Sequence, residues 1–93
     1  MLPERHVFVF SRDARSAPGG VFTTRAAAER WIRERRLTGT LTAFPLDEGC
    51  HDWAMRLGLV AGKAAERGAD AAFVASFSSA AQDHFHYTNG ELG

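Results

Sequence analysis

Two histidines near the C-terminal end of the sequence, His84 and His86, have the types and the spacing best suited to chemistry. They lie in a β-prone segment, and residues i and i+2 of a strand project from the same face. Two imidazoles on one face can reach a single divalent metal ion, although a tetrahedral site needs a further ligand. The alternative is that one histidine is exposed and the other is hydrogen-bonded at a sheet edge. Other residues of ligand type stand at distant positions: His6, Cys50, His51 and Asp52.

The run Cys50-His51-Asp52 places a nucleophile, a base and a carboxylate side by side. Adjacent side chains on a helix point about 100° apart, whereas catalytic triads are assembled from residues distant in sequence. Cys50 also shares an apolar stripe with Trp53 and Leu57, where it behaves as a small hydrophobe. The sequence has no dinucleotide-binding glycine motif, phosphate-binding loop, nucleophile elbow or Cys-x-x-Cys pair. These features favour a chain that is not an enzyme.

A group of arginines in the segment 25–36 offers a basic face for phosphate or for an acidic partner. Its members are Arg25, Arg30, Arg33, Arg35 and Arg36. Glutamates at positions 29 and 34 interrupt the group, and no aromatic residues interleave with it as stacked bases would require. We therefore expect no nucleic-acid partner, and a solvated helix face is the simplest interpretation of these arginines. If the face binds a protein, Arg30 and Arg33 are the expected contacts.

Two aromatic residues, Phe85 and Tyr87, alternate with the two histidines. Alternation places the aromatic pair on one face of a strand and the histidines on the other. If this last strand lies at a sheet edge, Phe85 and Tyr87 form a surface for strand addition or for a homodimer. The predicted interaction surface therefore consists of Phe85, Tyr87, Arg30 and Arg33.

Composition and length indicate one domain, residues 1–93, because 93 residues with 45% apolar and 24% charged side chains suit one modest core. The single cysteine cannot form an internal disulfide, and the apolar runs are too short to span a membrane. With no secretory pattern at the start, we expect a cytosolic protein. The net charge is zero, but residues 1–46 have eight basic and four acidic side chains, whereas residues 47–93 have three and seven.

The first half of the sequence predicts two short strands, a helix and a third strand. His6 to Phe10 and Gly20 to Thr23 are β-prone and separated by a polar loop, as in a hairpin. Apolar residues then recur at helical spacing from Arg25 to Arg36, after an N-cap at Thr23 or Thr24. We expect Gly39 to end this helix in a left-handed conformation. The segment 40–44 alternates as a strand that Pro45 terminates.

The second half predicts helices followed by a last strand. Residues 48–57 form an amphipathic helix closed by Gly58, and the alanine-rich segment 61–69 is an exposed connection. Asp70 caps a further short helix, and the segment 84–88 is a strand followed by the turn Asn89-Gly90. We therefore predict an α+β fold of order β-β-α-β-α-α-β, with its helices on one face of a small mixed or antiparallel sheet.

Several short motifs resemble those of an uncharacterised family of small, single-domain bacterial proteins, catalogued as a domain of unknown function. They are GVFT at 20–23, AERWI at 28–32, LTGTLT at 37–42, PLD at 45–47, DWA at 52–54, and FSSA at 77–80 through HFHY at 84–87. The family has tyrosine where this chain has His51, and a lysine-rich stretch where it has residues 61–69. The resemblance implies a bacterial source and supplies no activity.

Together these features favour a non-enzymatic cytosolic module that binds a protein partner, of the kind that recognises and inhibits it, as compact immunity proteins do. The alternative is a metal-binding protein or a metal-dependent enzyme that uses His84 and His86. Apart from this divalent metal, we expect no cofactor. A third interpretation, RNA binding through the arginines of the segment 25–36, predicts an affinity that falls steeply with salt.

Overall fold

The computed structural model describes residues 2–93. Its sheet has five antiparallel strands in the order β2-β1-β3-β4-β5. In chain order the elements are β1 (His6–Ser11), β2 (Gly20–Phe22), α1 (Arg25–Arg35), β3 (Gly39–Pro45), α2 (Cys50–Arg56), α3 (Lys63–Glu66), the 3-10 helix η1 (Arg67–Ala69), α4 (Ala71–Ala75), β4 (His84–Thr88) and β5 (Glu91–Leu92). The α+β class, the antiparallel alternative for the sheet and the β1–β2 hairpin are confirmed.

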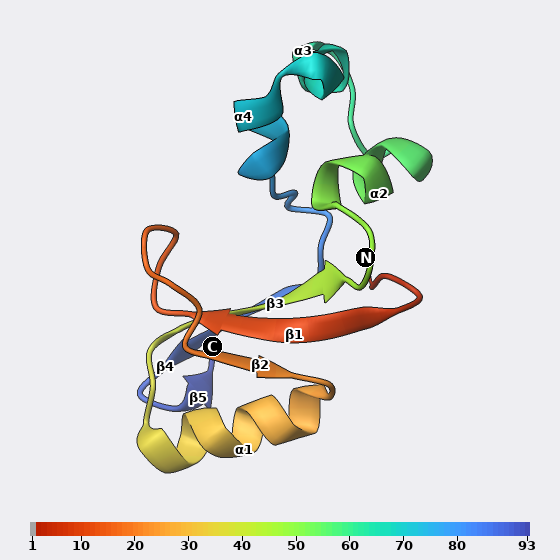
Figure 1. Ribbon diagram of the computed structural model, residues 1–93. Helices are drawn as coiled ribbons and strands as arrows, with labels where there is room; N and C mark the ends of the chain where they lie inside the picture. Colours follow the sequence, from red (N-terminus) through yellow and green to blue (C-terminus); the bar gives the residue numbers. More distant parts are fainter. Residues whose placement is uncertain (1) are drawn as a thin grey trace.

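The helices occupy both sides of the sheet (Figure 1). Helix α1 covers one face, whereas α2, α3 and α4 lie beyond the opposite face, so their placement differs from the predicted common face. Asp47 turns the chain away after β3, with φ at 61°. Within this second group of helices His51, Trp53 and Ala54 are buried, and His51 packs against the rings of Phe73 and Phe77. The molecule is therefore elongated, with principal extents of 42 × 26 × 21 Å.

Helix α1 begins after Thr24, one of the two predicted N-cap residues. The Thr24 hydroxyl oxygen accepts a hydrogen bond from the Ala27 amide at 3.2 Å. Arg36 takes the left-handed conformation at the helix end, with φ at 53°, so the expectation for Gly39 was wrong. Gly39 instead opens β3, where a Cβ would lie 2.5 Å from the carbonyl oxygen of Ser11. Close strand approach, and not backbone handedness, therefore explains this glycine.

The main core lies between the sheet and α1. Alternate residues of β1, β3 and β4 point toward the helix, as strand geometry requires. Trp31 packs at the margin of this core, with its ring edge-to-face on Phe10 at a centroid distance of 5.6 Å. The buried residues of the core are Phe8, Phe10, Ala28, Ile32, Leu41, Ala43 and Tyr87.

The segment 61–69 is more ordered than the predicted connection. It forms α3 and η1, although its described side chains are mostly exposed, as expected for an alanine-rich stretch. Asp70 caps α4 as predicted, because its carboxylate accepts from the Phe73 amide at 3.1 Å. No helix within residues 2–93 has the length and apolar character needed to cross a membrane.

Strand β5 was not predicted from the sequence. The turn at Asn89 and Gly90, with φ of 51° and 87°, reverses the chain so that β5 pairs with the end of β4. The Gly90 amide donates to the Leu37 carbonyl at 2.9 Å, which ties this turn to the end of α1. The C-terminal edge of the sheet is therefore β5, and β4 is covered along Tyr87 and Thr88.

Candidate functional site

His84 and His86 lie together on the sheet face opposite α1, and both are exposed. Their ring centroids are 5.4 Å apart. His84 Nδ1 lies 2.8 Å from the Gln82 carbonyl oxygen, and His86 Nδ1 lies 3.1 Å from the Thr40 hydroxyl. A carbonyl oxygen only accepts, so His84 Nδ1 bears the proton and the neutral ring presents its lone pair at Nε2. The structure thus brings the two predicted ligands together.

In the described part of the chain, no third ligand completes a metal site with this pair. Within residues 2–93 no cluster of three or more His, Cys, Asp or Glu side chains has the arrangement that a metal ion needs. His6 directs Nδ1 to the Pro3 carbonyl at 2.7 Å. His51 lies in the second group of helices, between the rings of Phe73 and Phe77 at 5.8 and 5.0 Å. The two histidines alone leave most of a coordination sphere to water or to an added ligand.

The Cys50-His51-Asp52 run does not form a nucleophilic site. Burial raises the pKa of the Cys50 thiol, which disfavours the reactive thiolate. His51 is 2% exposed and packs edge-on against aromatic rings, whereas Asp52 faces solvent. These side chains point in different directions from α2, as the helical geometry predicts.

Phe85 and Tyr87 lie on the covered face of the sheet, which corrects their predicted place on an interaction surface. Tyr87 is 3% exposed, and its hydroxyl donates to Glu29 at 2.7 Å. The Arg25 guanidinium lies 3.7 Å from the centroid of the half-buried Phe85 ring. Burial and the Glu29 carboxylate raise the pKa of Tyr87 to about 12. This pair anchors α1, because alternation along β4 turns it toward the core and the histidines outward.

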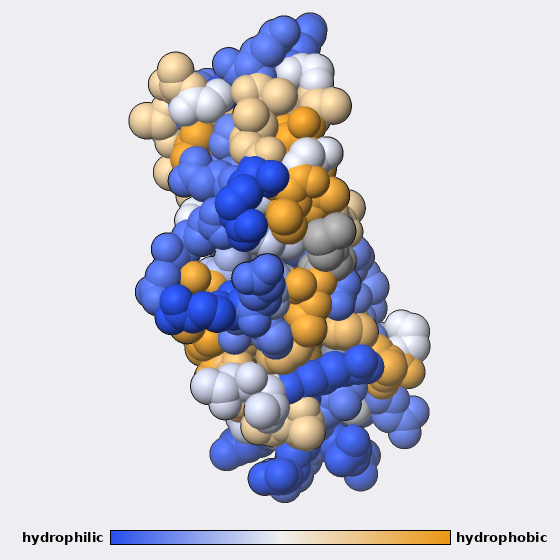
Figure 2. Space-filling model, turned by 90° about the vertical axis from the view of Figure 1, so that its right-hand side faces the viewer, coloured by the Kyte–Doolittle hydropathy of each residue, from blue (hydrophilic) through white to orange (hydrophobic). Residues whose placement is uncertain are grey.

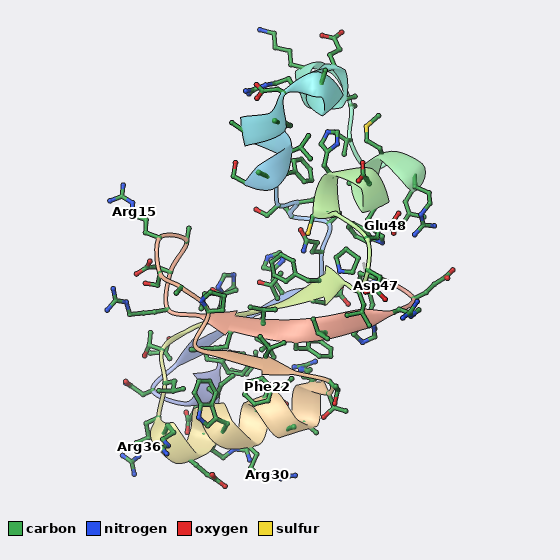
Figure 3. The ribbon with its side chains drawn as sticks, viewed as in Figure 1. Arg15, Phe22, Arg30, Arg36, Asp47 and Glu48 are labelled. Carbon is green, nitrogen blue, oxygen red and sulfur yellow. The ribbon has the colours of Figure 1, made fainter. Side chains whose placement is uncertain are left out.

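The outer side and the C-terminal end of α1 form a basic surface. We define this α1 surface by its exposed arginines: Arg30, Arg33, Arg35 and Arg36. None of them has a carboxylate partner within 4.0 Å among residues 2–93. The side chains of Arg30 and Arg36 point away from the sheet in Figure 3. Figure 2 shows hydrophilic side chains gathered at this end of the molecule.

A groove lies on the side of the sheet opposite α1, and the sequence analysis did not predict it. Its volume is about 570 Å³, and its floor is the open face of β1, β3 and β4. One wall is the β1–β2 loop, and the other is the segment 75–80 that leads from α4 toward β4. His84 lines the groove. The residues that line the groove lie far apart in the sequence and share no local pattern. The one relevant signal was the alternation along β4, which places His84 on the face opposite Phe85 and Tyr87.

Comparison with known proteins places the chain in a family. The family model described as "Domain of unknown function (DUF7710)" matches residues 7–93. The chain belongs to this family. The match includes α1, both histidines and every residue that lines the groove, and it confirms the resemblance to an uncharacterised family. No curated protein and no solved structure matches the chain. The DUF7710 description names no activity.

Proposed function

We propose that this chain is a non-enzymatic protein-binding module of the bacterial cytosol that recognises an acidic surface on a partner protein, as an immunity or inhibitor protein does. The observation that supports this most directly is the α1 surface, with its arginines free of carboxylate partners among residues 2–93. A guanidinium has a planar fork of donors that matches a carboxylate in two hydrogen bonds. An acidic partner would supply the carboxylates that α1 lacks.

The charge balance of α1 supports an acidic partner. Residues 25–36 contain five arginines and two glutamates, a net charge of +3 in a chain whose total is zero. Glu29 is already engaged by the Tyr87 hydroxyl and, at 3.4 Å, by Arg25. Glu34 is then the acidic side chain of this segment that remains on the exposed side. A surface of one sign steers a partner of the opposite sign and raises its association rate.

The helix that presents these arginines is firmly held. Ala28 and Ile32 are 0% exposed, and Thr24 caps the first turn. At the other end, the Gly90 amide donates to the Leu37 carbonyl just after α1. A fixed helix presents its side chains without paying for backbone ordering at the moment of binding.

A protein is a better fit than RNA for the α1 surface. Proteins that bind single strands use exposed aromatic rings on which bases stack. The aromatic residues near α1 face inward: Tyr87 is buried, and Trp31 is half-buried against Phe10. The α1 surface therefore offers charge and hydrogen-bond donors without a stacking platform.

The experiment compares three forms of the protein as bait in lysate of the source cell. The variant Arg30→Glu/Arg33→Glu reverses two charges of the α1 surface. The matched control Arg15→Glu/Lys63→Glu reverses two exposed charges elsewhere that also lack a carboxylate partner within 4.0 Å among residues 2–93. Each captured protein is then purified and titrated against all three forms at low and high salt, with a parallel capture after nuclease treatment.

We expect one acidic protein to bind the wild type and the control, with an affinity that falls as salt rises. An exposed ion pair contributes about 0.5 kcal/mol, and reversing one charge replaces that attraction by a similar repulsion. Each reversal therefore costs about 1 kcal/mol of binding free energy. The α1 variant should therefore lose about 2 kcal/mol, a roughly thirtyfold weaker Kd. Equal binding by all three forms, or capture that nuclease abolishes, would contradict the proposal.

A second candidate is divalent metal binding by His84 and His86. The observation in its favour is the hydrogen bond from His84 Nδ1 to the Gln82 carbonyl, because metal-ligating histidines commonly donate their other ring N–H to such a group. Elemental analysis of protein purified without a histidine tag tests it. Binding predicts about one metal per chain and a thermal shift with zinc, both lost in His84→Phe and kept in His6→Phe. Less than about 0.1 metal per chain, with no thermal shift, would reject it.

A further inference from the structure

We propose that the groove on the open face of the sheet is a second binding site, and that it takes an uncharged small molecule with an aromatic body and a hydrogen-bond donor. This site lies across the sheet from α1 and does not depend on the protein-binding function. Its volume of about 570 Å³ falls within the range of roughly 300–1,000 Å³ that is typical of small-molecule sites.

The shape of the groove favours a small molecule over a second copy of the chain. The β1–β2 loop and the segment 75–80 rise on either side of the open sheet face (Figure 1). Two flat sheet faces cannot meet across such walls. A narrow ligand can enter between them and reach the floor.

Apolar and aromatic side chains stand among serine and threonine hydroxyls on the floor and one wall of the groove. Val9 and Phe44 project from β1 and β3, and Phe77 follows α4. All three side chains are half-buried, so each retains surface that a ligand can cover. An aromatic ring suits this setting, because it gains from burial and from edge or offset contacts with the two phenylalanines.

Among the described residues that line the groove, the one carboxylate is already paired. Asp13 is the acidic residue of its lining, and its carboxylate already accepts from the Arg15 amide at 2.9 Å and the Ser16 hydroxyl at 3.0 Å. The Arg12 guanidinium adds a third bond at 3.1 Å and balances the charge. These three bonds keep the pKa of Asp13 below its ordinary value, so the group is ionised and occupied. An uncharged ligand matches this electrostatic balance.

His84 supplies the feature that selects a hydrogen-bond donor. Because Nδ1 donates to the Gln82 carbonyl, the neutral ring has an acceptor at Nε2, which has no hydrogen-bond partner among residues 2–93. A ligand hydroxyl or N–H can donate to that atom. An otherwise identical ligand without the donor would leave it unpaired.

Internal hydrogen bonds hold the wall beside His84 in place. Gln82 is 1% exposed, and its side-chain amide donates to the Ala43 carbonyl of β3 at 3.1 Å. Its side-chain oxygen accepts from the Ser79 amide at 2.8 Å. The same side chain therefore joins the segment 75–80 to the floor, and a ligand meets a groove that is already formed.

The test is an NMR titration of the whole chain with matched probes. Benzyl alcohol has the ring, the donor and no charge. Benzyl methyl ether lacks the donor, while benzylammonium and benzoate carry a charge. We expect benzyl alcohol to shift the amides of Thr42, Ser78 and His84 with saturation at millimolar concentration, as suits a ligand of this size. The other three probes should bind at least about tenfold more weakly.

Three variants separate this site from adventitious binding. Thr42→Trp fills the groove and should abolish the shifts, whereas Thr88→Trp adds the same side chain farther along the exposed side of the sheet and should not. His84→Phe removes the acceptor, so benzyl alcohol and its ether should then bind equally, which tests the site even if the first variant misfolds. No shifts at about 10 mM, shifts outside the groove, or a preference for a charged probe would overturn the proposal.

Discussion

Tyr87 allows a direct test of how the core holds α1. It is the one tyrosine of the chain, so tyrosinate absorbance at 295 nm reports on this residue alone. Burial, together with the hydrogen bond and charge of Glu29, raises its pKa from 10.0 to about 12. We expect an ionisation midpoint near pH 12 in the folded protein and near pH 10 in concentrated urea, a hundredfold difference in the ionisation constant.

Neighbouring substitutions should move this midpoint in opposite directions. Glu29→Gln retains an oxygen acceptor and removes the negative charge, so the midpoint should fall. Arg25→Gln removes the positive charge that favours tyrosinate, so the midpoint should rise. Arg30→Gln, a matched change of an exposed arginine, should leave it unchanged.

The same shift makes stability depend on pH with a defined sign. The folded state keeps the Tyr87 proton to a higher pH than the unfolded state, so its contribution is complete below pH 10 and is lost between about pH 10 and 12. The slope is at most about 1.4 kcal/mol per pH unit. Solvent screening lowers it, because the Glu29 side chain is 26% exposed.

The measurement is urea unfolding of the wild type and of Tyr87→Phe across this pH range. Below pH 10 the variant should be less stable by about 1.5 kcal/mol, as for a hydrogen bond to a charged acceptor. The difference should shrink as the pH rises toward 12, and taking the difference removes the effect of other groups that titrate. A folded-state midpoint of 10, or a difference independent of pH, would refute the buried Tyr87–Glu29 contact.

Two further substitutions test contacts that join separate segments of the fold. Gln82→Leu leaves the Ser79 amide and the Ala43 carbonyl without the Gln82 side chain as their partner. We expect the free energy of unfolding in urea to fall by about 2–4 kcal/mol. A fall below about 0.5 kcal/mol would contradict the role of Gln82 in joining these two segments. Gly90→Ala forces an alanine to φ of 87° with its Cβ 3.1 Å from the α1 backbone, and should cost at least about 1 kcal/mol. Gly93→Ala is the matched control, because nothing lies within 4 Å of the added Cβ and stability should not change. Equal unfolding midpoints for Gly90→Ala and Gly93→Ala would argue against this turn geometry.

The helices and the longer strands could be predicted from local patterns. Helical spacing of apolar residues located α1 and α2, and the Asp70 cap located α4. The same reasoning missed α3 and η1, because an alanine-rich segment with two glycines has no apolar stripe to indicate a helix. It also missed β5, whose two residues are too short to show any alternation.

The candidate sites were predicted only in part. Alternation along β4 correctly separated the histidines from Phe85 and Tyr87, but it did not tell which pair would face α1. The exposed arginines of α1 followed from helical spacing, whereas their lack of carboxylate partners depends on where every acidic residue lies. The groove is lined by residues from several segments between positions 9 and 84. Contacts between such distant segments produce no pattern in a short stretch of sequence.

The sequence by itself determined the helix and strand periods, the cap at Asp70, a cap for α1 at Thr23 or Thr24, and the turn at Asn89 and Gly90. Each of these depends on interactions among residues within four positions of one another. Only the tertiary structure decided that the helices divide between the two sides of the sheet and that Tyr87 is buried. Those outcomes depend on which of two faces buries more apolar surface, a competition among residues from the whole chain.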